Sequence, residues 1–251
     1  MDAAHIIRES VANVSGLRDS ASAEPKLAAA VSAVKHYQSL RFRYTYRDLI
    51  AGGPYQAAAR FFLKELYGDV DYSKRDAQFS RIAGTLQRVL PKQAVATAVA
   101  LARLHALTEK MDHQMGHALE SLVPVASDTQ RYVHAWRIVG QKEQRTLQLE
   151  LVLAMGKDLA KLTNTPGLRW LLKMMRGPAQ AAGLPDLQYF LETGFDTFAA
   201  MGKYKDGAAG FLKLIEARES NLIVALFDTG LKVQQAISDG VLPPDTSPGG
   251  I

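Results

Sequence analysis

LHALTEKMDHQMGHALESL, residues 104–122, carries the clearest structural signal of the chain. Its mostly apolar positions recur at intervals of three or four, which is the spacing of one face of an α-helix. The stripe consists of Leu104, Leu107, Thr108, Met111, Met115, Leu119 and Leu122. The stretch therefore predicts a long amphipathic helix, from Lys92 to Leu122, that packs one side against a core.

The same helical spacing continues along most of the chain on both sides of this stretch. Ser73 with Asp76, and Ser127 with Gln130, fit capping boxes at two helix starts. We expect an all-α protein, an irregular multi-helix bundle of seven to nine helices, with one domain over residues 1–228 and a loosely ordered tail over residues 229–251. The expected helices cover about residues 2–18, 26–51, 54–67, 73–90, 92–122, 127–162, 166–176, 186–203 and 206–227.

One stretch, LRFRYTYRDL at residues 40–49, alternates apolar and polar residues as a half-buried strand does. Phe42, Tyr46 and Leu49 also fit a helix, and no second convincing strand exists to pair with it. A helix is therefore the preferred interpretation, with a strand as the alternative. Arginines interleaved with aromatic rings can contact nucleic acid, but in a helix these arginines spread over more than half of the circumference. Nucleic acid is not an expected partner.

The composition describes a folded protein and excludes several kinds of site. The chain has 251 residues, of which 47% are hydrophobic and 22% charged, and a formal net charge of +5. It contains no cysteine, so disulfides, thiolate metal sites and cysteine nucleophiles are excluded. Residues 1–20 lack the basic start and apolar core of a signal peptide, and no apolar run is long enough for a membrane span. We expect a cytoplasmic protein.

Potential metal ligands follow one another at intervals of four in the quoted stretch. On a helical wheel of about 100° per residue, Glu109, His113 and His117 lie opposite the apolar stripe, on the side expected to face solvent. His105 and Asp112 fall on the flank, where a neighbouring helix would pack. An imidazole oriented by a carboxylate is suited to metal or haem ligation. We therefore predict His105 as the cofactor-binding residue, and His105, Glu109 and Asp112 as the ligands of any metal.

A further candidate site lies in ARFFLKELYGDVDYSKRDAQFSR, residues 59–81. Arg60 stands beside Phe61 and Phe62, and Arg75 and Asp76 stand near the start of the next helix. Charged residues next to a dense apolar cluster either form a polar bridge between two helices or line a pocket. Arg60 is expected to pair with a carboxylate there.

The segment FFLKELYG, followed by SKRDAQFSR, resembles a family of uncharacterised bacterial all-helical proteins that carry FFLxELYG and then an Arg-Asp pair. The matching residues lie between Arg60 and Arg81, a small part of the chain. The resemblance implies a bacterial origin and attaches no activity, ligand or cofactor.

The sequence favours binding over catalysis. It has neither a phosphate-binding loop of the Walker type nor a nucleophile elbow, and no convergent catalytic set. We expect a non-catalytic binding or regulatory protein of unknown ligand, with a protein or a second copy of the chain as a compatible partner. The alternative is a haem- or metal-binding protein that uses His105 with nearby carboxylates. The expected core contains Phe61, Phe62, Leu66, Leu104, Met111, Met115, Trp136, Trp170 and Phe190.

Overall fold

The fold is built from α-helices, and no β-strand occurs in the residues that the structure, a computed structural model, describes, namely 2–68, 70–122, 127–228, 233–238 and 240–244. The all-α class expected from the sequence is confirmed. In chain order the helices are α1 (Ala3–Ala23), α2 (Pro25–Thr45), α3 (Arg47–Ala51), α4 (Gln56–Glu65), α5 (Ser73–Val89), α6 (Lys92–Glu120), α7 (Asp128–Val139), α8 (Lys142–Leu162), α9 (Leu168–Met174), α10 (Arg176–Ala181), α11 (Pro185–Met201), α12 (Gly207–Phe227) and α13 (Val233–Ser238).

The described helices are more numerous than the seven to nine expected, because turns divide stretches that the spacing pattern joined. Between α7 and α8, Gly140 has φ 63° and ψ −125°, and Gln141 adopts the left-handed conformation with φ 58° and ψ 48°. These two conformations interrupt helical hydrogen bonding. Tyr46 separates α2 from α3 with φ −111° and ψ 20°. Residues 40–49 are therefore helical apart from this turn, and the strand alternative is wrong.

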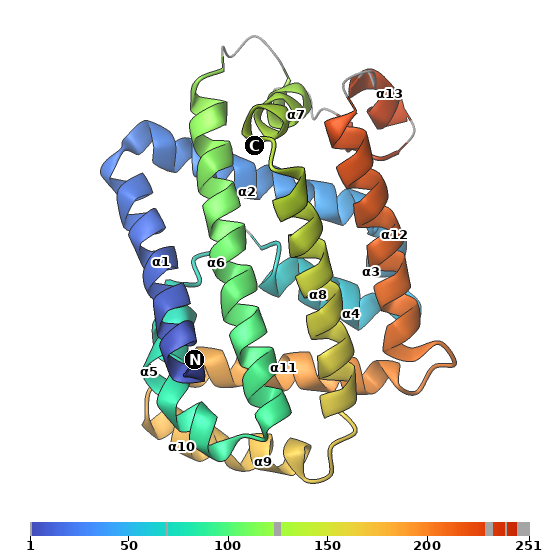
Figure 1. The fold of residues 1–251 in the computed structure, drawn as a ribbon. Helices are drawn as coiled ribbons and strands as arrows, with labels where there is room; N and C mark the ends of the chain where they lie inside the picture. The colour runs from blue at the N-terminus through green and yellow to red at the C-terminus, as the bar shows by residue number, and fades with distance from the viewer. Residues whose placement is uncertain (1, 69, 123–126, 229–232, 239, 245–251) are drawn as a thin grey trace.

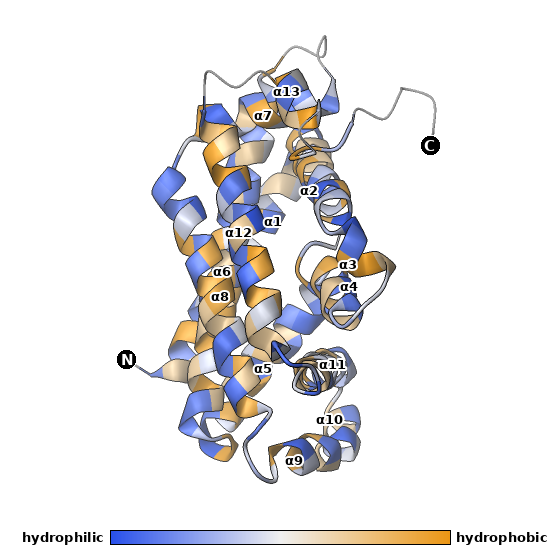
Figure 2. Ribbon diagram, turned by 90° about the vertical axis from the view of Figure 1, so that its right-hand side faces the viewer, coloured by the Kyte–Doolittle hydropathy of each residue, from blue (hydrophilic) through white to orange (hydrophobic). Residues whose placement is uncertain are grey.

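The helices form two layers. Figure 1 shows α1, α6, α8 and α12 side by side in one layer, with α2, α4 and α11 crossing behind them. Figure 2 shows the two layers edge on, with α6, α8 and α12 on one side and α2, α3, α4 and α11 on the other. α6 is the central helix, since it contacts α1, α2, α7 and α8. The residues that face from one layer to the other form the site described below.

Because α6 is central, one prediction from the helical wheel, the exposure of Glu109, is wrong. Met111 and Met115 are fully buried, as the apolar stripe predicts, but Glu109 is only 6% exposed although it was expected to face solvent. The reason is that α1 and α2 both pack on that side of α6. Gly116 permits the close approach of α2, because a Cβ there would lie 2.4 Å from Cγ2 of Val31. α6 is thus covered on several sides rather than on one.

Most of the expected core is buried, with one clear exception. Phe61, Phe62 and Phe190 pack in the cluster around α4, α11 and α12. Trp170, by contrast, is 65% exposed, so its assignment to the core is wrong. It lies on α9, a helix of seven residues in which Leu168 is the buried residue. A short peripheral helix buries too few positions to cover its large residues.

Of the two expected capping boxes, one is present. The Ser127 hydroxyl accepts a hydrogen bond from the Gln130 backbone N–H, and the Gln130 side chain accepts one from the Ser127 N–H. At α5 the box is absent, because Asp71 accepts hydrogen bonds from the N–H and the hydroxyl of Ser73. Asp76 points instead into the protein, where it joins a network of ion pairs.

The chain after α12 is partly helical. Within the expected tail, Ala236 of α13 is 3% exposed and Leu242 is fully buried, both in the cluster that contains Trp136. Residues 245–251 lie outside the described residues, and the domain boundary at residue 228 stays a prediction. None of the described helices has the length and apolar character needed to cross a membrane.

Candidate ligand-binding site

A cavity of about 160 Å³ lies between the two helix layers. α2, α4 and α11 contribute to its wall from one layer, and α6, α8 and α12 from the other, with further residues from α5 and α7. Its wall combines aromatic rings with an unusually large number of buried charged groups. The charged residues are Lys35, Arg41, Glu65, Arg75, Asp76, His105, Glu109, Asp112, Arg145 and Glu219.

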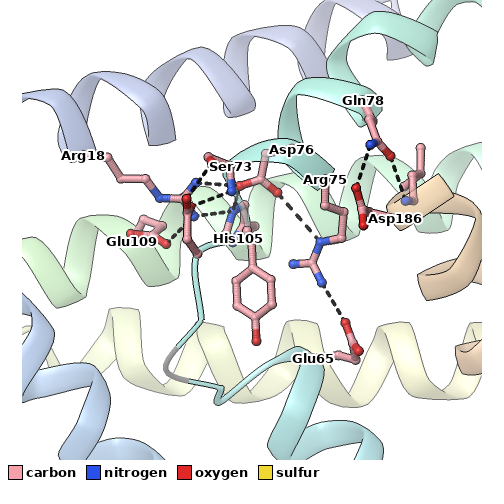
Figure 3. Close-up of polar contacts among 12 residues, drawn as sticks. Arg18, Glu65, Ser73, Arg75, Asp76, Gln78, His105, Glu109 and Asp186 are labelled. Carbon is pink, nitrogen blue, oxygen red and sulfur yellow. Dashed lines mark hydrogen bonds and ion pairs between the residues drawn. The ribbon is translucent and has the colours of Figure 1, made fainter. Parts of the chain in front are cut away.

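One side of the cavity carries an ion-pair network that joins α1, α2, α5 and α6. Figure 3 shows its members Arg18, Asp76, His105 and Glu109. Arg18 donates to Asp76 at 2.9 Å and to Glu109 at 2.8 Å. Lys35 donates to both carboxylate oxygens of Glu109, at 2.9 and 2.8 Å. His105 Nε2 lies 2.8 Å from the same Asp76 oxygen that Arg18 contacts. Two carboxylates on α5 and α6 thus share cations from α1 and α2.

The charges around these two carboxylates keep them ionised. Burial alone would raise the pKa of Asp76, but the hydrogen bond and charge of His105 and the charge of Arg18 outweigh it and lower the pKa. Burial likewise opposes ionisation of Glu109, while Lys35 and Arg18 bring its pKa below the ordinary value. Both groups therefore act as hydrogen-bond acceptors.

Two further ion pairs line the cavity. Arg75 donates to Glu65 at 3.1 Å and links α5 to α4, as Figure 3 shows. Arg41 on α2 donates to Glu219 on α12 at 2.5 Å, and the Tyr46 hydroxyl donates to the same Glu219 oxygen at 2.8 Å. Arg41 is 4% exposed and Glu219 7%, so this pair is deeply buried. Each of these arginines has its own carboxylate.

Arg145 differs from the other cations of the cavity. It is 6% exposed, and among the described residues no carboxylate lies within ion-pairing distance of it. Its Nη1 donates to the Gln148 side chain at 3.2 Å, while Nε and Nη2 are buried without a hydrogen-bond partner. Its guanidinium lies over the Trp136 ring, with Cζ 3.9 Å from the centroid. Burial lowers the pKa of Arg145, an indication of how poorly its charge is compensated.

Asp112 is a buried acid of the cavity that forms no ion pair with any described residue. It is 3% exposed, and its Oδ1 accepts a hydrogen bond from Gln38 at 2.9 Å. Burial raises its pKa, and the charge of Lys35 and the Gln38 hydrogen bond only partly offset that effect. Asp112 and Arg145 interact electrostatically but do not form an ion pair. The charge of Arg145 is therefore not neutralised by Asp112.

The structure brings five of the six predicted site residues to the cavity wall, and the three on α6 have other roles than metal ligation. His105 contacts Asp76. Glu109 accepts hydrogen bonds from Arg18 and Lys35. Asp112 accepts a hydrogen bond from Gln38. No three His, Asp or Glu side chains of the described residues are grouped so that they could hold a metal ion. The arrangement favours a structural ion-pair network, and metal or haem binding at His105 stays a prediction.

The remaining predicted residues separate into two groups. Arg75 and Asp76 line the cavity, as one of the two interpretations of that segment stated. Arg60 lies on the exposed side of α4 and forms no ion pair among the described residues, so its pairing with a carboxylate stays a prediction. The apolar spacing of α4 explains this, since Phe61 and Phe62 turn inward and place Arg60 outside.

The histidines after His105 also differ from each other. His117 is exposed, as expected, but His113 is only partly exposed, and its Nε2 is buried without a hydrogen-bond partner. The two rings contact each other edge to face at 4.8 Å between centroids. Burial, and then the charge of His117, lower the pKa of His113. Neither lines the cavity.

Sequence reasoning missed the residue with the most unusual environment. Arg145 lies in the mainly polar stretch KEQRTLQLE, residues 142–150, which is typical of a solvent-exposed helix start. The adjacent residues do not distinguish Arg145 from an exposed arginine. The spacing of residues along α8 does indicate its orientation. Arg145 precedes Leu149, Val152 and Gly156 by four, seven and eleven positions, which places all four on one face of the helix. Arg145 therefore stands on the inward face of α8.

Comparison with known proteins identifies no activity. A family model described as a domain of unknown function, DUF8198, matches residues 17–232. No curated protein matches the chain. No solved structure matches it either.

Proposed function

The chain belongs to the DUF8198 family, a domain of unknown function, and we propose that it is a non-catalytic binding protein that holds a small organic anion in the cavity between its helix layers. The proposal rests on one observation, the buried guanidinium of Arg145 with an unoccupied hydrogen-bonding edge. The segment that carries the sequence resemblance supports it, since Phe62, Glu65 and Tyr67 belong to the cavity wall.

The unpaired edge of Arg145 is one that can bind a carboxylate through two hydrogen bonds. The Nε–H and one Nη2–H point the same way and can donate to two oxygens of one carboxylate at once. The same chain contains an example, because Arg176 donates from Nε and from Nη2 to the carboxylate of Glu192. An anion in the cavity would complete the same bidentate pair at Arg145.

The local environment of Arg145, rather than the net charge of the cavity, favours a negative ligand. Arg41 and Arg75 are paired with Glu219 and Glu65, and Lys35 shares Glu109 with Arg18. Arg145 is left as a cation whose burial is unfavourable until an opposite charge approaches it. A neutral or cationic ligand would leave this cost in place.

The proposal of binding rather than catalysis is supported by how two acids of the cavity, Asp76 and Glu109, are engaged. Asp76 and Glu109 accept hydrogen bonds from cations that lower their pKa, which suits them to hold helices together rather than to exchange protons near neutral pH. The aromatic wall suits an organic ligand, since Trp136 lies against the guanidinium and Tyr132 lies beside Trp136.

The proposal is tested through the tryptophan that contacts Arg145. The chain has two tryptophans, so a Trp170→Phe background reports Trp136 alone. Titration with butanoate or benzoate is expected to change this fluorescence saturably and to raise the melting temperature. Arg145→Gln should weaken binding by roughly tenfold or more, because it removes charge-assisted hydrogen bonds.

Arg60→Gln is the matched control, because it removes the same charge from an exposed and unpaired arginine. It should bind the acids as the Trp170→Phe parent does. If Arg145→Gln binds them equally well, or if neither acid binds the parent protein, the proposal is wrong. Inorganic phosphate distinguishes the anion class, and tighter binding of phosphate than of both acids would overturn the assignment to organic anions.

A further inference from the structure

A second cavity, of about 130 Å³, lies next to the first and is apolar. α4, α5, α6, α8, α9 and α11 contribute to its wall. No charged side chain lines it, and Thr97 is the one hydroxyl among its side chains. A space lined mainly by Leu, Phe and Ala side chains gives water too few hydrogen-bond partners, so such a cavity attracts apolar groups.

The two cavities have a common wall. The side chains that line both are Phe62, Leu66, Phe79, Leu101, Leu187 and Phe190. All six are apolar, so the division between the cavities is made of groups that a hydrocarbon chain can pack against. The polar cavity and the apolar cavity can therefore act as two ends of one site.

α8 runs along both cavities, and successive parts of it line first the polar cavity and then the apolar cavity. Arg145, Gln148, Leu149 and Val152 line the polar cavity. Met155, Gly156, Leu159 and Leu162 continue the same helical face along the apolar cavity. From residue 145 to residue 156 the helix rises about 16 Å, at about 1.5 Å per residue. A ligand aligned with α8 would meet one cation at one end and only apolar groups at the other.

We propose that the anion bound at Arg145 is the carboxylate of a medium-chain fatty acid, whose alkyl tail lies in the apolar cavity. This inference rests on the proposed function, since it places the head group at the same arginine. A cavity of about 150 Å³ holds one benzene molecule, so the apolar cavity takes about six carbons and the polar cavity a similar number of atoms. Octanoate and decanoate match that capacity, whereas palmitate exceeds it.

The test is a chain-length series in the Trp170→Phe background. The probes are butanoate, hexanoate, octanoate, decanoate and palmitate, each titrated below its micelle concentration. Each methylene buried in the apolar cavity should tighten the dissociation constant by up to about fourfold, which is the affinity equivalent of transferring one methylene out of water. The gain should end near decanoate, and palmitate should bind more weakly than decanoate.

Two substitutions on α6 separate the tail from the head. Ala98 lines the apolar cavity, so Ala98→Leu should weaken decanoate binding at least tenfold and leave butanoate binding unchanged. Ala96→Leu is the matched control, because Ala96 is exposed on the same helix, and both acids should bind it normally. If Ala98→Leu does not fold, Leu172→Ala enlarges the same cavity and should move the optimum beyond decanoate.

The outcomes distinguish the two proposals. If butanoate binds through Arg145 and affinity does not depend on chain length, the fatty-acid inference is wrong and the anion site stands. If Ala98→Leu weakens butanoate as much as decanoate, the tail does not lie in the apolar cavity. If no acid of the series binds, the anion site itself is wrong, and the fatty-acid inference falls with it.

Discussion

The guanidinium of Arg145 lies over the indole of Trp136, with Cζ 3.9 Å from the ring centroid, while two of its nitrogens are buried without a partner. The ring supports the cation from one face by its π-electrons but offers no hydrogen bond to the Nε and Nη2 edge. Arg145 is therefore held in place and left incompletely satisfied, which is the state expected of a preorganised anion receptor.

Replacing Arg145 by Met should stabilise the ligand-free protein by about 1–3 kcal/mol, because it removes a buried cation that lacks a carboxylate and keeps a similar volume. Urea unfolding in anion-free buffer measures this. Arg41→Met is the matched comparison, since Arg41 is equally buried but paired with Glu219. It should lose about 3–5 kcal/mol by leaving that carboxylate unpaired. Equal losses in both variants would contradict our view of Arg145.

Glu109→Ala should destabilise the protein by about 1–3 kcal/mol, because Arg18 and Lys35 both lose their shared acceptor. The cost is below that of a fully buried pair, since the side chains of Arg18 and Lys35 are 23% and 25% exposed and water partly replaces the carboxylate. Glu120→Ala, at an exposed position of the same helix, should change stability by no more than about 0.5 kcal/mol. Indistinguishable urea midpoints for the two variants would show that the network adds nothing.

Asp112→Asn should remove a pH-dependent cost. The pKa of Asp112 is raised in the folded protein, so above its ordinary value of about 3.9 the folded state binds the proton more tightly than the unfolded state. The stability of the wild type therefore falls as pH rises through the folded pKa, and Asp112→Asn should not show this fall. Urea unfolding from pH 4 to pH 8 measures the difference between the two proteins. A difference that stays constant with pH would contradict the raised pKa.

Asp76→Asn should change the pH dependence of stability in the opposite direction to Asp112→Asn. The pKa of Asp76 is lowered, so its contribution to stability is present above the ordinary pKa and is lost as pH falls through the folded value. The destabilisation caused by Asp76→Asn should therefore be largest near neutral pH and should shrink in acid. A deficit that grows as the pH falls would contradict the ion-pair assignment of Asp76.

Phe62→Ala should cost about 3–5 kcal/mol, because the ring is 2% exposed and packs against Phe198 and Phe211. Trp170→Ala should cost no more than about 0.5 kcal/mol despite the larger side chain, since Trp170 is 65% exposed. Thermal unfolding of both variants checks the pair. Similar losses would show that α9 is held through Trp170 after all.

The sequence predicts where helices begin and which residues they contain better than it predicts which helices pack against each other. Helical spacing identified the all-α class, and the box of Ser127 and Gln130 begins α7 where the local pattern places it. The wheel for residues 104–122 assumes one buried face, which fails for a helix covered by α1, α2, α7 and α8. Glu109 therefore appeared exposed although it is buried.

The candidate site could be predicted only in part, for a related reason. His105, Asp112, Arg75 and Asp76 were selected from local spacing, and all four line the cavity. Their partners Arg18, Lys35 and Gln38 come from α1 and α2, far away in the chain, and no local pattern joins them. The unusual feature of Arg145 is that it has no carboxylate partner among the described residues. This feature depends on the positions of all its neighbours, so the sequence alone does not show it.

The ion pairs of the cavity also constrain the order in which the chain can fold during synthesis. Arg18 and Glu109 are 91 residues apart, Lys35 and Glu109 are 74 apart, and Arg41 and Glu219 are 178 apart. α1 and α2 therefore leave the ribosome well before the carboxylates that neutralise them, and α2 completes its burial only after α12 has been made. Until those carboxylates are made, α2, which carries four cationic residues and no acid, is a cationic, half-apolar surface, and this is the form of the chain that a chaperone would meet.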